Sequence, residues 1–467
     1  MKTKKPILNP DGKKQPYPGY LPYYFFMKGY IIILVSILLT VVNSQPVYSV
    51  PGFARQTGLS CSACHNMFPE INSFGREFKL NGYTLTNINT LIEKNDKEEI
   101  LLKLLTYSPL SAMVQTSFTN LNTKIPGTQN NNVELPQQLS LFYTGLISPH
   151  LGTFIQLTYS GHDGALGMDN VDIRYNNMTM VGSKRLIYGA TLNNNPSVQD
   201  VWNSIPAWRF PYATSGIAPS PSAAPLIEGA LAQQVAGLGG YLFFNNLIYA
   251  ELSLYRSAQQ GALLPPDATA SGIIQGVAPY WRFALQHAWD KHYLEVGTTG
   301  MSTRLYPNGV SGLTDRYTDV GFDLQYEYTF PKSTFKFHPS WFHESQSLDA
   351  TFDAGNSQNK KNNLNSLKMS AEIYSDKGFG ATLGYFSVNG SKDDGLFSSA
   401  AITGSSANSP NSNGFIAELS YLPWYNTKFA LQYTKYNKFN GASRNYDGFG
   451  RNASDNNSLY FLVWLCF

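Results

Sequence analysis

The sequence predicts an all-β protein, a transmembrane antiparallel β-barrel of about sixteen strands that is preceded by a small helical segment acting as its plug. Three observations lead to this prediction. Apolar and polar residues alternate with a period of two over most of the chain after residue 108. The links between these stretches are alternately short and long. A short motif with two cysteines and a histidine stands before them.

Residues 1–49 are expected to be a signal peptide, with Met27 as a possible true start because the segment before it is long and Pro-rich. Residues 29–42 are apolar and lie between Lys28 and small residues, a stretch too short and wrongly flanked for a membrane-spanning helix. The whole chain carries 34 Lys and Arg against 31 Asp and Glu, but the basic excess lies before Val50. The charge of the remaining chain therefore does not indicate a nucleic-acid partner. No phosphate-binding or nucleophile-elbow motif stands in a plausible context, so neither nucleotide binding nor serine hydrolysis is indicated.

A C-x-x-C-H motif occupies residues 61–65. Cys61 and Cys64 have the spacing that forms thioether bonds to the two vinyl groups of a haem, and His65 is then placed as the proximal axial ligand of the haem iron. The alternatives are a chance occurrence and a redox or zinc site. Only Cys466 remains for a zinc cluster, and no βαβ pattern surrounds the motif. The sequence therefore predicts one covalent haem c.

The haem segment is assigned to residues 50–90 and is expected to contain a short helix that begins near Pro69 and stops at Asn81–Gly82. Some forty residues are too few to bury a haem unaided. The segment must therefore pack against the rest of the chain, with residues 91–107 as a linker and residues 108–467 as the barrel.

The barrel strands are predicted from alternation such as that of residues 322–330, where aromatic and aliphatic side chains alternate with polar and charged ones. The same alternation fits a soluble sandwich, in which the apolar face would point inward. Strictly alternating short and long links favour a membrane barrel with tight periplasmic turns and long extracellular loops. The strands are expected near residues 108–120, 137–147, 151–162, 169–180, 184–193, 233–244, 247–256, 278–288, 291–300, 318–330, 333–344, 364–374, 378–388, 413–422, 427–438 and 457–467. Both termini would then be periplasmic.

The segment over residues 51–83 also resembles a known family. Pro51-Gly-Phe-Ala-Arg-Gln-Thr-Gly, the C-x-x-C-H motif, Phe68-Pro69, Asn72-x-Phe-Gly-Arg-x-Phe-Lys79 and Gly82-Tyr83 are similar to the haem motif of the fused monohaem cytochrome c–porins of iron-oxidising bacteria. The resemblance implies an extracellular electron donor, typically Fe(II), and a soluble periplasmic cytochrome as acceptor. Over the barrel the resemblance is architectural only.

The distal haem ligand is left open. Met67 is too near His65 to reach the opposite haem face, whereas Met113, Met178, His162 and His338 are candidates at expected lumen positions. His162–Asp163 and His343–Glu344 are the nearest approach to clusters that could dock a donor metal ion. The charges expected in the lumen, as cross-strand pairs or as a cation path, are Asp172, Arg174, Arg185, Glu251, Arg256, Arg282, Glu295, Asp323, Glu327, Lys336, Lys368, Glu372 and Glu418.

Two functions follow from these features. The first is an outer-membrane electron-transfer protein, an iron:cytochrome oxidoreductase that takes electrons from an extracellular donor. The second is a porin-type transport channel whose haem segment is a structural or gating plug. A soluble periplasmic β-protein with a haem tether is a third interpretation. The expected partners are the donor, a periplasmic acceptor and outer-membrane lipid, with the oligomeric state left open.

Overall fold

The computed structural model describes residues 52–85, 90–258 and 266–467, so the predicted signal peptide lies outside the described residues. The N-terminal elements are α2 (Gly52–Thr57), α3 (Cys61–Cys64), β1 (His65–Met67), β2 (Glu70–Ile71), α4 (Ser73–Leu80), β3 (Thr90–Lys94) and β4 (Ile100–Leu105). The barrel strands are β5 (Leu110–Leu121), β6 (Asn132–Ser148), β7 (Leu151–Ser160), β8 (Ala165–Val181), β9 (Lys184–Asn193), β10 (Val235–Phe244), β11 (Ile248–Ser257), β13 (Ala278–Trp289), β14 (His292–Tyr306), β15 (Asp315–Phe330), β16 (Ser333–Ser347), β17 (Lys361–Ser375), β18 (Phe379–Gly390), β19 (Ser412–Trp424), β20 (Thr427–Lys438) and β21 (Ser458–Cys466). The connections contain β12 (Ile273–Ile274), α5 (Asp349–Asp353) and the short turns η1 (Pro206–Trp208), η2 (Leu226–Glu228) and η3 (Ala453–Asn456).

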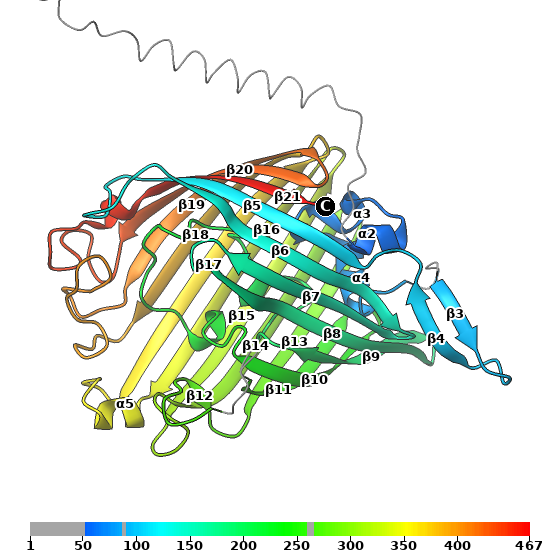
Figure 1. The fold of residues 1–467 in the computed structure, drawn as a ribbon, viewed down its shortest axis with the longest axis horizontal. Coiled ribbons are helices and arrows are strands. Elements are labelled where there is room, and N and C mark those ends of the chain that lie inside the picture. Colours follow the sequence, from blue (N-terminus) through cyan, green and yellow to red (C-terminus); the bar gives the residue numbers. More distant parts are fainter. Residues whose placement is uncertain (1–51, 86–89, 259–265) are drawn as a thin grey trace, which may run out of the picture. The chain divides into compact units, whose positions relative to one another are not determined.

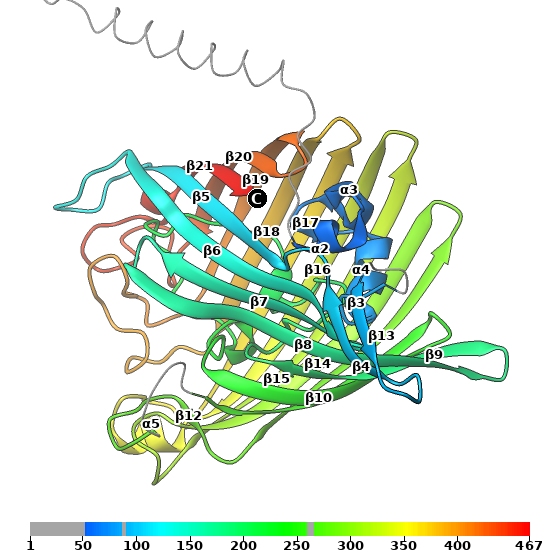
Figure 2. The same cartoon turned by 45° about the vertical axis from the view of Figure 1, so that its right-hand side comes forward.

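The long strands form one closed antiparallel barrel, which confirms the predicted fold class (Figures 1 and 2). Each strand pairs with the next along the chain, and the barrel closes where β21 pairs with β5, with Leu462 opposite Ser117. The short β12 is an accessory piece between β11 and β14, so the wall itself has the predicted sixteen strands. Closure satisfies every strand edge, which is the condition for strands to lie in lipid. No helix among the described residues is long and apolar enough to cross a bilayer.

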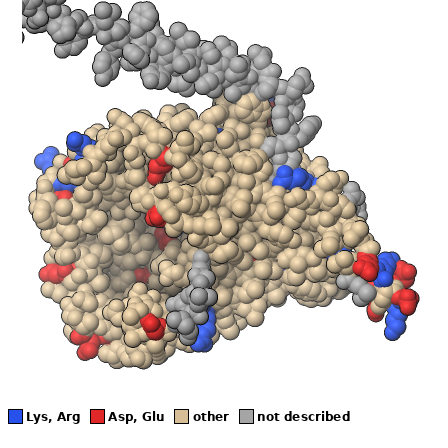
Figure 3. All heavy atoms as spheres, in the orientation of Figure 1, with Lys and Arg blue, Asp and Glu red and all other residues tan. Residues whose placement is uncertain are grey.

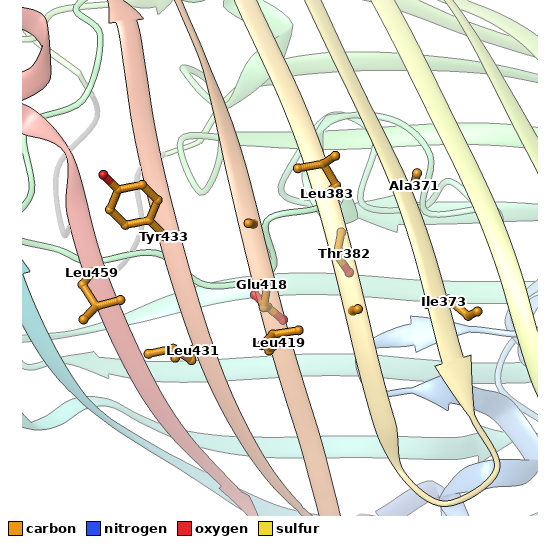
Figure 4. A pocket seen from close by; sticks show the side chains of 11 residues that line it. Ala371, Ile373, Thr382, Leu383, Glu418, Leu419, Leu431, Tyr433 and Leu459 are labelled. Atoms are coloured by element: carbon orange, nitrogen blue, oxygen red, sulfur yellow. The ribbon is translucent and has the colours of Figure 1, made fainter.

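The two faces of the wall differ in polarity as the alternation predicts. Figure 4 shows Leu383 and Leu419 on the near side of β18 and β19, and Thr382 and Glu418 on the other side of the same strands. Leu419 is 63% exposed whereas Glu418 is buried. A surface on which the large aliphatic side chains point outward and the charges point inward is that of a transmembrane barrel of the outer-membrane type. Other exposed apolar side chains include Leu238, Leu252, Leu254, Phe283, Phe322 and Leu431.

The connections differ at the two ends of the barrel. At one end, called the short-turn end, tight turns such as Asn245–Asn246 and Asp290–Lys291 join the strands. At the other, called the long-loop end, the connections are longer, with the β7–β8 turn as an exception. The connection over 194–234, called the inward loop, packs its Trp202 and Ile205 against buried lumen-facing side chains of the wall.

Glu228 of the inward loop fastens this loop to the wall. Its carboxylate bonds the Arg209 guanidinium at 2.6 Å and the Lys368 ammonium at 2.6 Å. Burial alone would raise the pKa of Glu228, but Arg209 and Lys368 outweigh burial and lower it to about 2. The anchor therefore stays charged in moderately acidic solution.

Residues 52–85, called the plug, are held in the barrel near the short-turn end. The Arg76 guanidinium bonds the carboxylate of Glu327 on β15 at 2.5 Å, and the Tyr83 hydroxyl donates to Asp172 on β8 at 2.6 Å. Lys79 donates to the Val198 and Asp200 carbonyls of the inward loop, so plug and inward loop contact each other inside the wall. The stretch predicted as a linker contains the hairpin β3–β4, which the alternation analysis did not anticipate.

Candidate functional site

The C-x-x-C-H motif forms a one-turn helix followed at once by a short strand. Cys61 and Cys64 begin and end α3, so their side chains lie on one face at i and i+3. His65 begins β1, which pairs with β2 so that His65 lies opposite Ile71. Asn72 fixes this unit to α4, since its side chain accepts from the Gly75 amide at 3.0 Å and donates to the Ala63 carbonyl at 3.0 Å. The helix predicted from Pro69 thus begins three to four residues later, at the Asn72 cap.

Gly75 is required where α4 crosses the haem motif. A Cβ atom at this position would lie 2.3 Å from the Cys64 carbonyl oxygen and 3.2 Å from the Ile71 Cβ. Since the first contact is with backbone, the two helices would have to separate.

Gly75→Ala is expected to reduce the covalent haem content of the protein several-fold, because α4 can no longer support the Cys64 end of α3. Haem stain per barrel on a denaturing gel measures this. Phe74→Ala, at an exposed position on the same helix, is the matched control, and equal staining of both variants would contradict the prediction.

A cavity of about 470 Å³ lies between the plug and the inner face of the wall. Cys61, Cys64 and His65 all line it, and Phe68 and Phe78 add apolar surface from the plug. The wall and the inward loop supply the remaining sides, including Met113, Phe142, Phe154, Trp208, Tyr212 and Trp464. Its size lies within the range of small-molecule and cofactor sites, and its lining is mainly apolar.

Burial sets the protonation states of the side chains in the motif. Burial lowers the pKa of His65 to about 4, which keeps the imidazole neutral and its lone pair available to a metal. The Nδ1 atom of His65 is buried and makes no hydrogen bond of ordinary geometry with the described residues. The nearby Pro69 backbone raises the pKa of His65 and so offsets part of the effect of burial. Burial, followed by the neighbouring Cys61, raises the pKa of Cys64 to about 11, so this thiol is neutral.

These residues fit the haem c that the sequence predicts. Two thiols on one helix face, a neutral imidazole next to them and an apolar cavity of cofactor size are the elements that such a group requires. Haem would be held by Cys61 and Cys64 and ligated by His65.

Solved structures of outer-membrane proteins are similar to this chain over part of its length. No family model matches the chain, and no curated protein matches it. Among solved structures, an anion-selective porin from Comamonas acidovorans is 13% identical, with a TM-score of 0.45, over 77% of this chain and 98% of that one. A loop-deletion form of the outer membrane protein OmpT of Vibrio cholerae is 10% identical, with a TM-score of 0.42, over 77% and 98%. The outer membrane channel DcaP of Acinetobacter baumannii is 11% identical, with a TM-score of 0.42, over 77% and 96%. These likenesses concern the fold alone.

The structure separates the four candidate distal ligands. Met113 is buried on the inner face of β5 and lines the cavity. Met178 is on the same face of β8 as the buried Arg174, but it lies past the last β8 residue that pairs with β7, is 57% exposed and does not line the cavity. His162 lies in the exposed β7–β8 turn, so it does not face the lumen as expected. His338 faces the lumen but does not line the cavity. Cys466, for which the sequence predicts no role, lines the same cavity as Cys61 and Cys64.

The predicted lumen charges are largely confirmed, with Arg256 as the error. Arg256 is exposed on the outer face because it lies five residues from the buried Glu251, and an odd spacing places two residues on opposite faces. The same rule separates the outward His343 from the buried Glu344, so these two residues form no donor cluster. His162–Asp163 lie together in an exposed turn.

Four acids of β15 share its inner face at intervals of four residues: Asp315, Asp319, Asp323 and Glu327, called here the acidic ladder. All four are buried, and successive members are about 13 Å apart along the strand. Asp315 at the long-loop end caps α5 by accepting from the Ala350 amide, and Glu327 bonds Arg76 of the plug. The ladder therefore leads from the long-loop end to the plug. Of these four acids the sequence predicts Asp323 and Glu327, the two nearer the plug, as lumen charges.

The middle of the ladder holds more carboxyl groups than basic side chains. A single guanidinium, that of Arg282, bonds Asp323 at 2.5 Å, Glu295 at 3.0 Å and Asp200 at 3.3 Å. Nearer the long-loop end, Asp319 lies directly opposite Glu344 on β16. Figure 3 shows the molecule hollowed on one side of the view, with acidic side chains in and around the hollow. Such a lining attracts cations rather than anions.

Proposed function

We propose that this protein is an outer-membrane c-type cytochrome that accepts electrons from an extracellular donor, expected to be Fe(II), and passes them to a soluble periplasmic c-type cytochrome. The observation that carries the proposal is the cavity between plug and wall, which Cys61, Cys64 and His65 line together. A bound haem would supply a one-electron redox centre whose potential the surrounding shell sets.

The chain's own residues would enclose that centre. The apolar side chains from the plug, wall and inward loop limit water around the group. Met113 is the candidate distal ligand that the cavity offers, and a thioether ligand would suit a donor of high potential. Cation–π contact between Arg76 and Tyr293, with a guanidinium-to-centroid distance of 4.1 Å, helps to hold the plug in place.

The connections support an orientation with the long loops outside the cell and the tight turns in the periplasm. In this proposed orientation the plug, its haem motif and the C-terminal end of β21 are periplasmic. In this orientation a soluble acceptor meets the haem from the periplasm, and the acidic ladder leads a cationic donor inward from outside.

The second candidate function is a porin-type transport channel in which the haem segment is a gate or a structural plug. The closed barrel and the hollow in Figure 3 favour it. The burial of lumen-facing charges speaks against a wide pore, since Arg174, Arg282 and Lys336 would be wet in an open channel but are at most 1% exposed.

Anaerobic visible spectra test the proposal. The detergent-solubilised protein is expected to show reduced-haem bands within seconds of Fe(II) addition at several pH values. If dithionite reduces the haem and Fe(II) does not, ferrous iron is not the donor. Planar-bilayer recordings distinguish the transport channel from the electron-transfer protein, because a large steady conductance from haem-loaded protein would favour the channel.

A further inference from the structure

A buried group of possible metal ligands lies where the plug meets the wall. Glu70 of β2, His338 of β16 and Glu372 of β17 each offer one ligand atom, and these atoms all lie within 4.8 Å of one another. The three residues are 0%, 7% and 1% exposed. One imidazole and two carboxylates form a mixed nitrogen and oxygen donor set, which suits first-row transition metals.

Strand register and plug insertion bring the three residues together. His338 lies opposite Ser370, and Glu372 is two residues further along β17, so His338 and Glu372 are diagonal neighbours on the lumen face. Glu70 belongs to the plug and contacts Lys336 of the wall. It lies next to Ile71, which pairs with His65, so the third ligand belongs to the two-stranded unit that also carries the expected proximal haem ligand.

His338 has an unused nitrogen. Its Nε2 is buried and has no hydrogen-bond partner among the described residues. Its Nδ1 lies 3.8 Å from the Glu372 carboxylate, which is too far for a hydrogen bond. A buried imidazole without a partner is costly unless something else binds it.

The two carboxylates keep acceptor capacity beside their present partners. Glu70 contacts the Lys336 ammonium and the Tyr212 hydroxyl, but each carboxylate oxygen can accept a further ligand. Within the described part of the chain, Glu372 accepts hydrogen bonds from two hydroxyl groups, those of Ser370 and Tyr374. Counting Glu327 and Arg76 with them, three carboxyl groups face two basic side chains. The nearby Glu418 is neutralised by Lys428, with 3.0 Å between their charged atoms.

We propose that Glu70, His338 and Glu372 bind one divalent first-row transition metal ion. If the proposed function holds, on which this assignment of the ion rests, the ion is the Fe(II) donor at the inner end of the acidic ladder. There it would lose one electron to the haem and become Fe(III), and the electron would pass on to the periplasmic cytochrome.

Equilibrium dialysis of the haem-loaded protein against Co²⁺ tests the site, with bound cobalt measured by mass spectrometry. The unmodified protein is expected to bind one tight Co²⁺ per chain. His338→Gln should weaken this binding at least 10-fold, within the range that loss of a ligand produces. His287→Gln, an exposed histidine near the short-turn end, is the matched control and should not change it. Equal binding by the His338 and His287 variants would overturn the proposal.

Glu372→Gln provides a second test if the His338 variant does not fold, as judged by heat-modifiable migration. It too should weaken Co²⁺ binding, and unchanged binding would also overturn the proposal. Co²⁺ binding does not depend on haem reduction. If Co²⁺ binds tightly through His338 but Fe(II) does not reduce the haem, the metal site is supported and the proposed function is contradicted. If Fe(II) reduces the haem equally fast in the unmodified and His338→Gln proteins, the proposed function is supported and the assignment of this site to the donor is contradicted.

Discussion

Replacement of both Cys61 and Cys64 by serine is expected to abolish covalent haem while leaving the barrel folded. The two thiols lie on one face of α3 and line the cavity, and the structure places no other cysteine on that helix. Serine is nearly isosteric but cannot form the thioether. Haem staining after denaturing electrophoresis should fall to background, and the heat-modifiable migration of the barrel should persist.

A matched variant makes this result specific. Cys466→Ser changes the third cysteine that lines the cavity, on β21, and should keep full haem staining. His65→Ala should retain attached haem but alter its visible spectrum, because attachment and axial ligation are separate roles. Staining of the double serine variant at the level of the unmodified protein would contradict the haem assignment.

The second large effect concerns the buried ammonium of Lys336. It contacts Glu70 of the plug, lies 3.1 Å from the Glu327 carboxylate and donates to the Ile71 carbonyl at 3.1 Å. Lys336→Met would leave these carboxylates buried and short of a counter-ion, which typically costs about 3–5 kcal/mol. The plug is therefore expected to detach first, because Glu70 belongs to it.

Limited proteolysis measures this effect as the rate at which the plug is cleaved in folded barrels. Lys332→Met, at the exposed β15–β16 turn, is the control and should be cleaved at the rate of the unmodified protein. Adding Glu70→Gln to Lys336→Met should restore part of the protection, since it removes one uncompensated charge. Equal cleavage of the Lys336 and Lys332 variants would show that the ion pair does not hold the plug.

The barrel could be predicted from the sequence because lipid and lumen impose opposite polarities on alternate residues. The strand bounds of β9 and β20 were predicted without error, and the other strands differ by a few residues. Arg256 and the His343–Glu344 pair are errors that strict alternation would have avoided, because an odd spacing places two residues on opposite faces. The other errors occur where alternation carries no information, since Met178 lies past the last β8 residue that pairs with β7 and His162 lies in a turn.

The site could be predicted only in its local part. Cys61, Cys64 and His65 are adjacent in sequence and carry their own spacing signal. The group of Glu70, His338 and Glu372 joins residues up to 302 positions apart, and it depends on both strand register and plug insertion. Residues so far apart in the chain form no motif whose spacing could predict that they lie together. The sequence therefore predicts His338 only as a candidate haem ligand and Glu372 only as a lumen charge.

The acidic ladder also limits how β15 can change in evolution. Because all four acids depend on even spacing, inserting or deleting one residue between Asp315 and Glu327 would turn part of the ladder toward the hydrocarbon of the bilayer. The ionised carboxylates would then face lipid, while aromatic side chains such as Phe322 entered the interior. Length variation among descendants of this chain should therefore fall in the loops, and within β15 only changes of two residues at a time should survive.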